Sequence, residues 1–469
     1  MAIAWNAIET LGKQLFSLLI TIVLARLLEP EDFGLIGMIT VFVMIANVVV
    51  EGGFMGALIY KKTVGDTDYD TVFFLNLGSA LILYGALFLL SGPIAGFYGQ
   101  PKLEILLKWL SGSMVLGSLS VVHYAMYYRK MDFKPMAKVG LLAQSLSGGI
   151  AIVVAYLGGG VWSLVVQHLL LGFLTAVFFW TTNPWRPHWR FSQKSFRSLF
   201  GYGTPLMFTS IMQQLFDNLY YVVIGKFYNP VQLGFYLQAN KIQRIPALKI
   251  QEIIKKVTFP DFTRMAGDTE QTVAYFKSMF KNTMALNFPV LIALSLFCGN
   301  LVPLLLTDKW LPIIPYIQLL CMASLFLPFY SLCSNIVLGM GKSLLNFKIE
   351  AIKNLCIVAS VLIAFQWGII GLILGQIVCS LAFVFIHLHF VQSVVPIKAS
   401  RFLLPMLRYL AMAFFPYVLV KLAMENYPLQ HFWNLLIYGS AYFLLYLGLM
   451  LSMDVGKADA LKKLLGQRP

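Results

Sequence analysis

The sequence predicts an all-α protein that crosses a membrane many times. Its 469 residues are 59% hydrophobic and only 12% charged, and the mean hydropathy is +0.77. Soluble globular domains contain about 25% charged residues. Apolar stretches long enough to span a bilayer recur from the start of the chain to about residue 453. Because no small-residue cleavage site follows the first stretch, we expect it to be a mature helix and not a signal peptide.

The lengths of the apolar stretches give the number of spanning helices. A helix needs about 20 predominantly apolar residues to cross the hydrocarbon core of a bilayer. Dividing the chain by this length predicts fourteen segments, at residues 4–27, 33–58, 71–95, 104–128, 138–157, 160–182, 202–227, 232–255, 282–306, 313–338, 349–366, 369–391, 403–423 and 431–453.

Lys and Arg are distributed unevenly between the loops that join these segments. When each loop takes the number of the segment before it, and the cations of the eighth segment are counted with the loop that follows it, 28 of the 35 Lys and Arg residues fall on the even side or in the C-terminal tail, and six fall on the odd side. Cytoplasmic loops are enriched in these residues, so both termini are predicted to be cytoplasmic. A wrong helix count would disturb the alternation. The net charge of +15 therefore reflects membrane topology, and no nucleic acid is expected as a partner.

The first half of the chain is similar to the second. At a shift of 200 residues, the stretch 13–35 aligns with 213–235 without a gap. The identical pairs include Gln14/Gln214, Leu15/Leu215, Phe16/Phe216, Leu19/Leu219, Val23/Val223, Pro30/Pro230 and Gly34/Gly234. Each half then holds six predicted helices. Since six is an even number, both halves enter the membrane from the same side, as parallel repeats do.

The repeat predicts the domain organisation. We expect an N-terminal six-helix bundle at residues 1–200 and a C-terminal six-helix bundle at residues 201–400, placed around a central cavity. Residues 401–469 are expected to add two peripheral transmembrane helices and a basic cytoplasmic tail. A chain that already contains two matched bundles is expected to work as a monomer.

Polar side chains gather in three of the predicted helices. Ionisable residues inside a bilayer cost a few kcal/mol each and usually face protein or water. The polar and ionisable residues of this chain lie in the first helix (Glu9, Lys13, Gln14), in its repeat partner the seventh (Gln213, Gln214, Asp217, Asn218) and in the eighth (Asn240, Lys241, Arg244, Gln251, Glu252, Lys255). Arg244 is expected roughly 16 Å below the periplasmic start of its helix, near the bilayer midplane. A guanidinium there suits a wet cavity and binds phosphate or pyrophosphate through two hydrogen bonds.

These polar residues also have a structural interpretation. Glu9 and Lys13 are four residues apart and can neutralise each other, and Lys249, Lys255 and Lys256 can reach the cytoplasmic headgroups. The predicted substrate-binding residues are Lys13, Gln14, Gln213, Gln214, Asn218, Asn240, Lys241, Arg244, Gln251 and Lys255. Glu9 and Asp217 are the candidates for ion coupling.

The sequence shows no sign of an enzyme or a metal protein. Residues Gly339–Ser343 resemble the end of a phosphate-binding loop, but Ile336 stands where that pattern requires Gly. The five Cys residues lie in or beside apolar segments without metal-ligand spacing, so we expect reduced core residues. His387 and His389 are two residues apart and point to different faces of a helix. We expect no cofactor, no metal and no catalytic residue.

Three stretches carry a family resemblance. Residues Ala25–Gly34, with the sequence Ala-Arg-Leu-Leu-Glu-Pro-Glu-Asp-Phe-Gly, are similar to the first-loop signature of bacterial polysaccharide exporters. These are the O-antigen and exopolysaccharide flippases of the multidrug/oligosaccharidyl-lipid/polysaccharide (MOP) superfamily. Residues Glu51–Phe54 and Ala57–Ile59 resemble the subgroup that includes the colanic-acid exporter. The stretch from Phe235 to Arg264 is similar to the eighth-helix region of the family.

The resemblance, which covers essentially the whole chain, implies a function. Family members are V-shaped pairs of bundles that move an undecaprenyl-pyrophosphate-linked oligosaccharide from the cytoplasmic to the periplasmic leaflet of the inner membrane by alternating access, for lipopolysaccharide O-antigen or exopolysaccharide biosynthesis. The resemblance implies basic cavity residues that attract pyrophosphate and sugar acids, and Arg244, Lys241 and Lys13 are the candidates. The expected partners are this lipid-linked substrate and membrane lipids, with functional coupling to a polysaccharide polymerase and to glycosyltransferases.

Two alternatives belong to other functional classes. A cation-coupled multidrug or metabolite antiporter of the same fold would be expected to have an acidic cavity, whereas the eighth helix is basic. A membrane enzyme of polysaccharide assembly would be expected to have a large periplasmic loop, and none of the odd loops is long.

Overall fold

Every regular element in the described part of the chain is a helix. We analysed a computed structural model that describes residues 2–61, 63–398 and 400–452. The basic tail predicted beyond residue 452 lies outside the described residues. The chain forms two compact units that meet in sequence between Leu237 and Gln238, and each is treated by itself. The predicted domain boundaries near residues 200 and 400 concern the repeat, and they remain a prediction.

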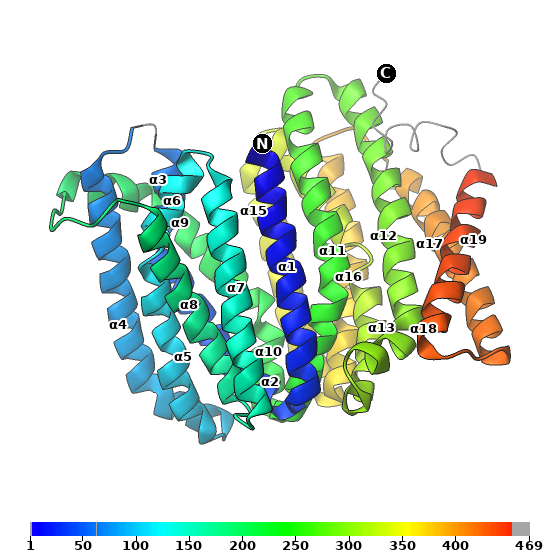
Figure 1. Cartoon of the computed structure of the whole chain (residues 1–469). Coiled ribbons are helices and arrows are strands. Elements are labelled where there is room, and N and C mark those ends of the chain that lie inside the picture. The colour runs from blue at the N-terminus through cyan, green and yellow to red at the C-terminus, as the bar shows by residue number, and fades with distance from the viewer. Residues whose placement is uncertain (1, 62, 399, 453–469) are drawn as a thin grey trace. The chain divides into compact units, whose positions relative to one another are not determined.

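The first unit contains ten helices and the start of an eleventh within its described residues. They are α1 (Ala2–Leu27), α2 (Pro30–Glu51), α3 (Phe54–Tyr60), α4 (Asp66–Tyr98), α5 (Lys102–Ser118), α6 (Val121–Arg129), α7 (Phe133–Tyr156), α8 (Trp162–Thr182), α9 (Gln193–Asp217), α10 (Leu219–Phe227) and the start of α11 (Pro230–Arg264). Helix α1 packs on α7, α7 on α8, α8 on α5 and α5 on α4, so these long helices run side by side (Figure 1). Helix α2 packs on α4, α5, α9 and α10.

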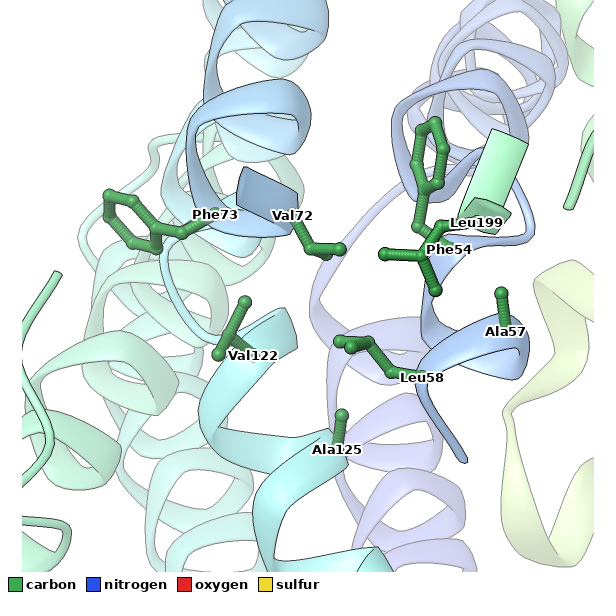
Figure 2. Packing of buried hydrophobic residues seen from close by; sticks show 8 residues of the cluster. All are labelled: Phe54, Ala57, Leu58, Val72, Phe73, Val122, Ala125 and Leu199. Carbon is green, nitrogen blue, oxygen red and sulfur yellow. The ribbon is translucent and has the colours of Figure 1, made fainter. Parts of the chain in front are cut away.

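An apolar cluster joins one end of α3, α4, α6 and α9. Figure 2 shows its buried residues, which are Phe54, Ala57, Leu58, Val72, Phe73, Val122, Ala125 and Leu199. Polar contacts surround the same end. The guanidinium of Arg129 donates to the last carbonyls of α3 and to that of Lys61 at 2.6 Å, and Lys61 pairs with Asp68 at 2.7 Å. These contacts fix the short helix α3 against α4 and α6.

The second unit continues α11 and adds the remaining helices. They are α12 (Thr269–Leu305), η1 (Asp308–Ile313), α13 (Ile314–Ala323), α14 (Leu327–Gly339), α15 (Ser343–Ala364), η2 (Phe365–Trp367), α16 (Gly368–Gln392), α17 (Ser400–Asn426), α18 (His431–Trp433), η3 (Asn434–Tyr438) and α19 (Gly439–Ser452). Helix α16 packs on α13, α14 and α15, while α12 packs on α13, α14 and α17. Phe280 of α12 contacts Phe329 and Phe402 at its core.

Eleven helical stretches of the described chain are long and apolar enough to cross a membrane. One of them, Ser343–Gln392, contains both α15 and α16, which correspond to two predicted segments. The predicted seventh and eighth segments are helical as α9, α10 and α11, but they are not among the eleven stretches. The protein is therefore a multi-pass membrane protein, and the count of fourteen crossings remains a prediction.

Several predicted segments are broken helices. Gly52 and Gly53 separate α2 from α3 and have positive φ angles of 53° and 67°. This left-handed conformation favours glycine because it has no Cβ atom. Helix α9 ends at Asp217, inside the predicted segment 202–227. Hydropathy cannot reveal such breaks, because one or two residues hardly change the average of an apolar run.

Candidate functional site

The predicted polar residues of α1 form an ion pair that packs within the first unit. Lys13 Nζ lies 2.7 Å from Glu9 Oε1, and Glu9 is only 6% exposed. The stem of Lys13 lies against Gly140 of α7, where a Cβ atom would come within 1.8 Å of Lys13 Cε. Gln14 is half-buried. This geometry supports the structural interpretation of the Glu9–Lys13 pair, since each charge has its partner one turn away.

The polar residues of α9 divide into a helix cap and two exposed side chains. Asn218 is 5% exposed, and its Nδ2 atom donates to the backbone carbonyl of Gln214 at 2.8 Å and to Gln214 Oε1 at 3.0 Å. These two residues therefore close the end of α9. Gln213 and Asp217 are exposed. Since α1 packs on α7 while α9 packs on α2, α3 and α4, the matched polar residues of the repeat have different neighbours.

The polar residues of α11 form a stripe in the second unit. Asn240 is buried, Lys241 and Lys255 are exposed, and Arg244 and Gln251 are half-buried. Arg244 and Gln251 are seven residues apart, nearly two helical turns, so they lie on the same face. Gln251 Nε2 donates to Ser331 Oγ of α14 at 2.8 Å, which directs this part of the stripe towards α14.

Arg244 differs from the other charged residues around it. Within the described residues it makes no hydrogen bond and no ion pair with the protein. Pro246 follows two residues later and lacks the amide that would bond to the carbonyl of residue 242. A half-buried guanidinium without a protein acceptor keeps its donors available for an anionic ligand.

An ion-pair network towards the end of α11 was missed at the level of the sequence. Glu252 accepts from Lys249 at 3.1 Å and from Lys256 at 2.7 Å. The signal was present, because residues three and four apart on a helix are neighbours. Lys249 and Lys256 therefore share one carboxylate, and no ion pair joins this carboxylate to Arg244 among the described residues.

Two polar residues of α14 hold α11 in place and were also missed. Asn335 is 1% exposed, and its Nδ2 atom donates to Thr258 Oγ1 at 2.7 Å and to the carbonyl of Lys255 at 3.1 Å. Ser331 is the second, and its hydrogen bond with Gln251 ties α11 to α14 at another level. A lone Asn or Ser in an apolar helix gives no sequence signal of its partner.

The described residues include His, Cys, Asp and Glu side chains of the types that bind metal ions. Among them, no group of three or more His, Cys, Asp or Glu side chains is arranged to hold a metal ion. All five cysteines are free thiols, as predicted, and four of them are buried. His387 is fully buried and stacks on Tyr330 with ring centroids 4.9 Å apart.

Long apolar helices, with polar residues gathered on a few of them, define a polytopic membrane protein. A family model described as "Polysaccharide biosynthesis protein" matches residues 23–315, which is more than half of the chain. The chain therefore belongs to the polysaccharide biosynthesis protein family. The match includes the first-loop signature at residues 25–34 and the eighth-helix region, so the family resemblance is confirmed.

Known proteins extend the comparison over most of the chain. The lipopolysaccharide biosynthesis protein WzxC of Escherichia coli (strain K12) is 28% identical over 381 residues, which cover 79% of this chain and 76% of WzxC. A solved structure of the lipid II flippase MurJ in an inward closed conformation aligns with a TM-score of 0.73 and 16% identity, covering 95% of this chain and 97% of MurJ.

A second solved structure has another function. The inward-facing structure of a multidrug resistance MATE family transporter of the MOP superfamily aligns with a TM-score of 0.60 and 17% identity, over 83% of this chain and 98% of the transporter. The chain thus has the fold of the MOP superfamily. Because a flippase and a drug transporter share this fold, the choice between them depends on the residues of the site.

Proposed function

We propose that this protein is a flippase for an undecaprenyl-pyrophosphate-linked oligosaccharide. It would move this substrate from the cytoplasmic to the periplasmic leaflet of the inner membrane, by alternating access, for the biosynthesis of lipopolysaccharide O-antigen or exopolysaccharide. The observation that carries the proposal is Arg244, a half-buried guanidinium on α11 that has no acceptor among the described residues. Family membership supports the same substrate class.

The chemistry of α11 favours an anionic substrate. Arg244 presents a planar set of donors that matches two oxygens of a pyrophosphate, and Lys241 adds a positive charge less than one turn earlier. Glu252, the acidic residue of this stripe, is held between Lys249 and Lys256. A binding site for drug cations would need the opposite charge. The flippase is therefore preferred to the antiporter of the same fold.

The remaining substrate contacts and the energy source belong to the same proposal. Gln213, Lys241 and Lys255 are exposed, and they are our candidates for contacts with sugar hydroxyls and acids. Asp217 is exposed on α9 and is our candidate for ion coupling, whereas Glu9 is engaged with Lys13. The loop charges support fourteen crossings with both termini in the cytoplasm, which would place the basic loops on the side where the lipid-linked substrate is made.

Arg244→Ala tests the proposal in the host that encodes the chain. Cells without the gene are expected to lose surface polysaccharide and to accumulate undecaprenyl-linked oligosaccharide. Loss of charge-assisted hydrogen bonds worth about 1.5–3 kcal/mol predicts an export rate reduced by about tenfold to a hundredfold. Export is measured as newly labelled surface polysaccharide at matched protein levels.

The control for this experiment is Arg264→Ala. Arg264 is the last residue of the same helix, its side chain is 81% exposed, and it lies 3.9 Å from Asp261. Its removal is expected to leave export near the normal rate. Unchanged export by the Arg244→Ala variant would contradict the anion-binding role, and unchanged polysaccharide in cells without the gene would contradict the proposed function.

A further inference from the structure

The segment that joins α8 to α9 combines positive charge with aromatic side chains. We call residues 183–197, which include the first residues of α9, the strap. Its positively charged and aromatic residues are Arg186, Arg190, Lys194, Arg197, Trp185, Trp189, Phe191 and Phe196. No Asp or Glu occurs between Asp132 and Asp217, so the neighbouring sequence does not balance these charges. Membrane topology alone explains Lys and Arg in a cytoplasmic loop, but it does not explain aromatic residues among them.

Hydrogen bonds fix the course of the strap along the start of α4. The amide of His188 donates to Asp70 Oδ1 at 3.0 Å, and the amide of Ser192 donates to Thr71 Oγ1 at 3.1 Å. Asp70 and Thr71 are fully buried. The hydroxyl of Ser192 also accepts from the amide of Ser195 at 3.2 Å and so caps α9. The strap therefore presents its exposed side chains from a fixed backbone.

These bonds place the strap at the edge of the apolar part of the first unit. Residues 70 and 71 lie where the predicted membrane segment 71–95 begins, and α8 ends at Thr182. The strap thus runs from α8 along the start of α4 at the level where the hydrocarbon of a bilayer gives way to headgroups. The predicted topology assigns this level to the cytoplasmic leaflet.

One of the four cations is used within the protein. The guanidinium of Arg186 donates to the carbonyls of Trp180 at 2.7 Å, Asn183 at 2.6 Å and Trp185 at 2.8 Å. It also lies over the ring of Trp180, 5.4 Å from the ring centroid. Arg186 therefore closes the end of α8, because its donors satisfy carbonyls that the helix leaves open.

The other three cations have no carboxylate partner. Arg190, Lys194 and Arg197 are exposed, and no ion pair joins any of them to an acidic side chain among the described residues. Lys194 and Arg197 are three residues apart on α9 and are therefore neighbours. Lys61, near the same end of α4, differs because it pairs with Asp68 at 2.7 Å. Three unneutralised charges in one short segment favour an extended anionic partner.

The aromatic residues indicate what kind of anionic partner this is. The ring of Trp189 stacks on Phe74 of α4 with centroids 4.7 Å apart, yet Trp189 is 93% exposed. Phe191 is 60% exposed. Trp is enriched where a membrane meets water, because its apolar ring and its polar N–H group are both accommodated there. Exposed aromatic residues beside free cations therefore fit a lipid surface better than a polar protein surface.

We propose that the strap is a binding site for anionic phospholipids of the cytoplasmic leaflet. Arg190, Lys194 and Arg197 bind the phosphates of the headgroups, and Trp189 inserts its ring beside the upper part of the acyl chains. This inference rests on the predicted topology for its side of the membrane. It goes beyond the proposed function, because it does not depend on what the protein transports.

The test is a lipid titration of the purified full chain in detergent. The probes are phosphatidylglycerol, which is anionic, and phosphatidylcholine, which has no net charge, and native mass spectrometry counts the bound lipids. Because each cation near an anionic surface strengthens binding about fivefold, the wild-type protein is expected to bind its first phosphatidylglycerol at least about tenfold more tightly than its first phosphatidylcholine. The triple variant Arg190→Gln, Lys194→Gln, Arg197→Gln is expected to lose this preference.

The matched control removes three exposed cations from other places on the predicted cytoplasmic side. Arg264→Gln, Lys281→Gln, Lys398→Gln changes the net charge by the same amount, but its residues lie on α11, on α12 and before α17. This control is expected to keep the preference of the wild-type protein. A wild-type protein without a preference would overturn the lipid site and would leave the free cations for an acidic protein. Equal affinities in the two triple variants would overturn it as well.

Fluorescence quenching tests the position of Trp189 separately. The protein contains nine Trp residues, so the emission of Trp189 is taken as the difference between the wild-type protein and Trp189→Phe. Phosphatidylglycerol brominated on its acyl chains is expected to quench this emission at lower lipid concentrations than brominated phosphatidylcholine does. Bound brominated phosphatidylglycerol that leaves the emission of Trp189 unchanged would overturn the assignment of the lipid to the strap.

Discussion

Arg244 owes its proposed role to its surroundings as much as to its charge. Lys249 and Lys256 of the same helix form ion pairs with Glu252, and Lys13 of α1 forms one with Glu9. Arg244, in contrast, has no acceptor among the described residues. A charged side chain that is half-buried without a protein partner needs water or an anion, because burial of an unpaired charge is costly. Its position therefore predicts a wet environment inside the membrane region.

This wet environment can be measured by thiol labelling. A cysteine introduced at position 244 in a background without native cysteines is expected to react with a water-soluble thiol reagent. A cysteine at position 247 is the control, because Ala247 on the same helix is fully buried. A position 244 that reacts no faster than position 247 would contradict the wet site.

The sequence revealed some residue contacts and hid others for a physical reason. The Glu9–Lys13 pair could be predicted, because a helix brings residues four apart together. The close fit of Lys13 on Gly140 could not, because it depends on how α1 meets α7. Asn218 is a similar case. Nothing in the sequence indicated that its side chain caps α9, and its role in binding remains a prediction.

At the scale of the elements, α11 is a polar helix held in place by α14. Its hydrogen bonds to Asn335 and Ser331 compensate for its low apolar content and fix the level at which Arg244 lies. A helix that carries binding residues must be positioned this firmly if the donors are to meet a ligand in one geometry.

The anchoring predicts a stability effect. Asn335→Ala removes two buried hydrogen bonds and is expected to lower the stability of the protein by about 1–3 kcal/mol, a loss of a few degrees in Tm. Thermal unfolding of the purified protein in detergent measures it. Asn426→Ala is the control, because Asn426 is exposed and, among the described residues, bonds only to the carbonyl one turn before it. Equal Tm values for the two variants would show that Asn335 does not anchor α11.

Hydropathy predicted the helix ends that coincide with the end of an apolar run. It did not predict helix ends that lie beyond such a run. Apolar length located most helices, but α12 begins at Thr269 while the predicted segment began at residue 282. Hydropathy detects the part of a helix that contacts lipid, and this helix continues beyond that part. The break at Gly52 was hidden for the opposite reason, because a glycine interrupts the helix while hardly lowering the average hydropathy of the apolar run.

At the scale of the whole molecule, the internal repeat was the most informative feature of the sequence. It predicted matched helices, and equivalent points of the two halves meet in the structure, where a Cβ atom on Gly34 would lie 1.7 Å from the carbonyl oxygen of Pro230 and one on Gly234 would lie 1.9 Å from that of Pro30. The charge alternation of the loops predicts the membrane topology, and the family match shows a member of the polysaccharide biosynthesis protein family.

The central claim is tested most directly by a flipping assay with the purified full chain. Proteoliposomes contain a radiolabelled undecaprenyl-pyrophosphate-linked oligosaccharide from the host, and a membrane-impermeant glycosidase reports which leaflet holds the sugar. The wild-type protein is expected to move the labelled oligosaccharide from the protected inner leaflet to the leaflet that the enzyme reaches. Arg244→Ala is expected to slow this movement by at least about tenfold, and Arg264→Ala is expected to leave its rate unchanged. An inner-leaflet fraction that stays protected in the presence of the wild-type protein would contradict the account.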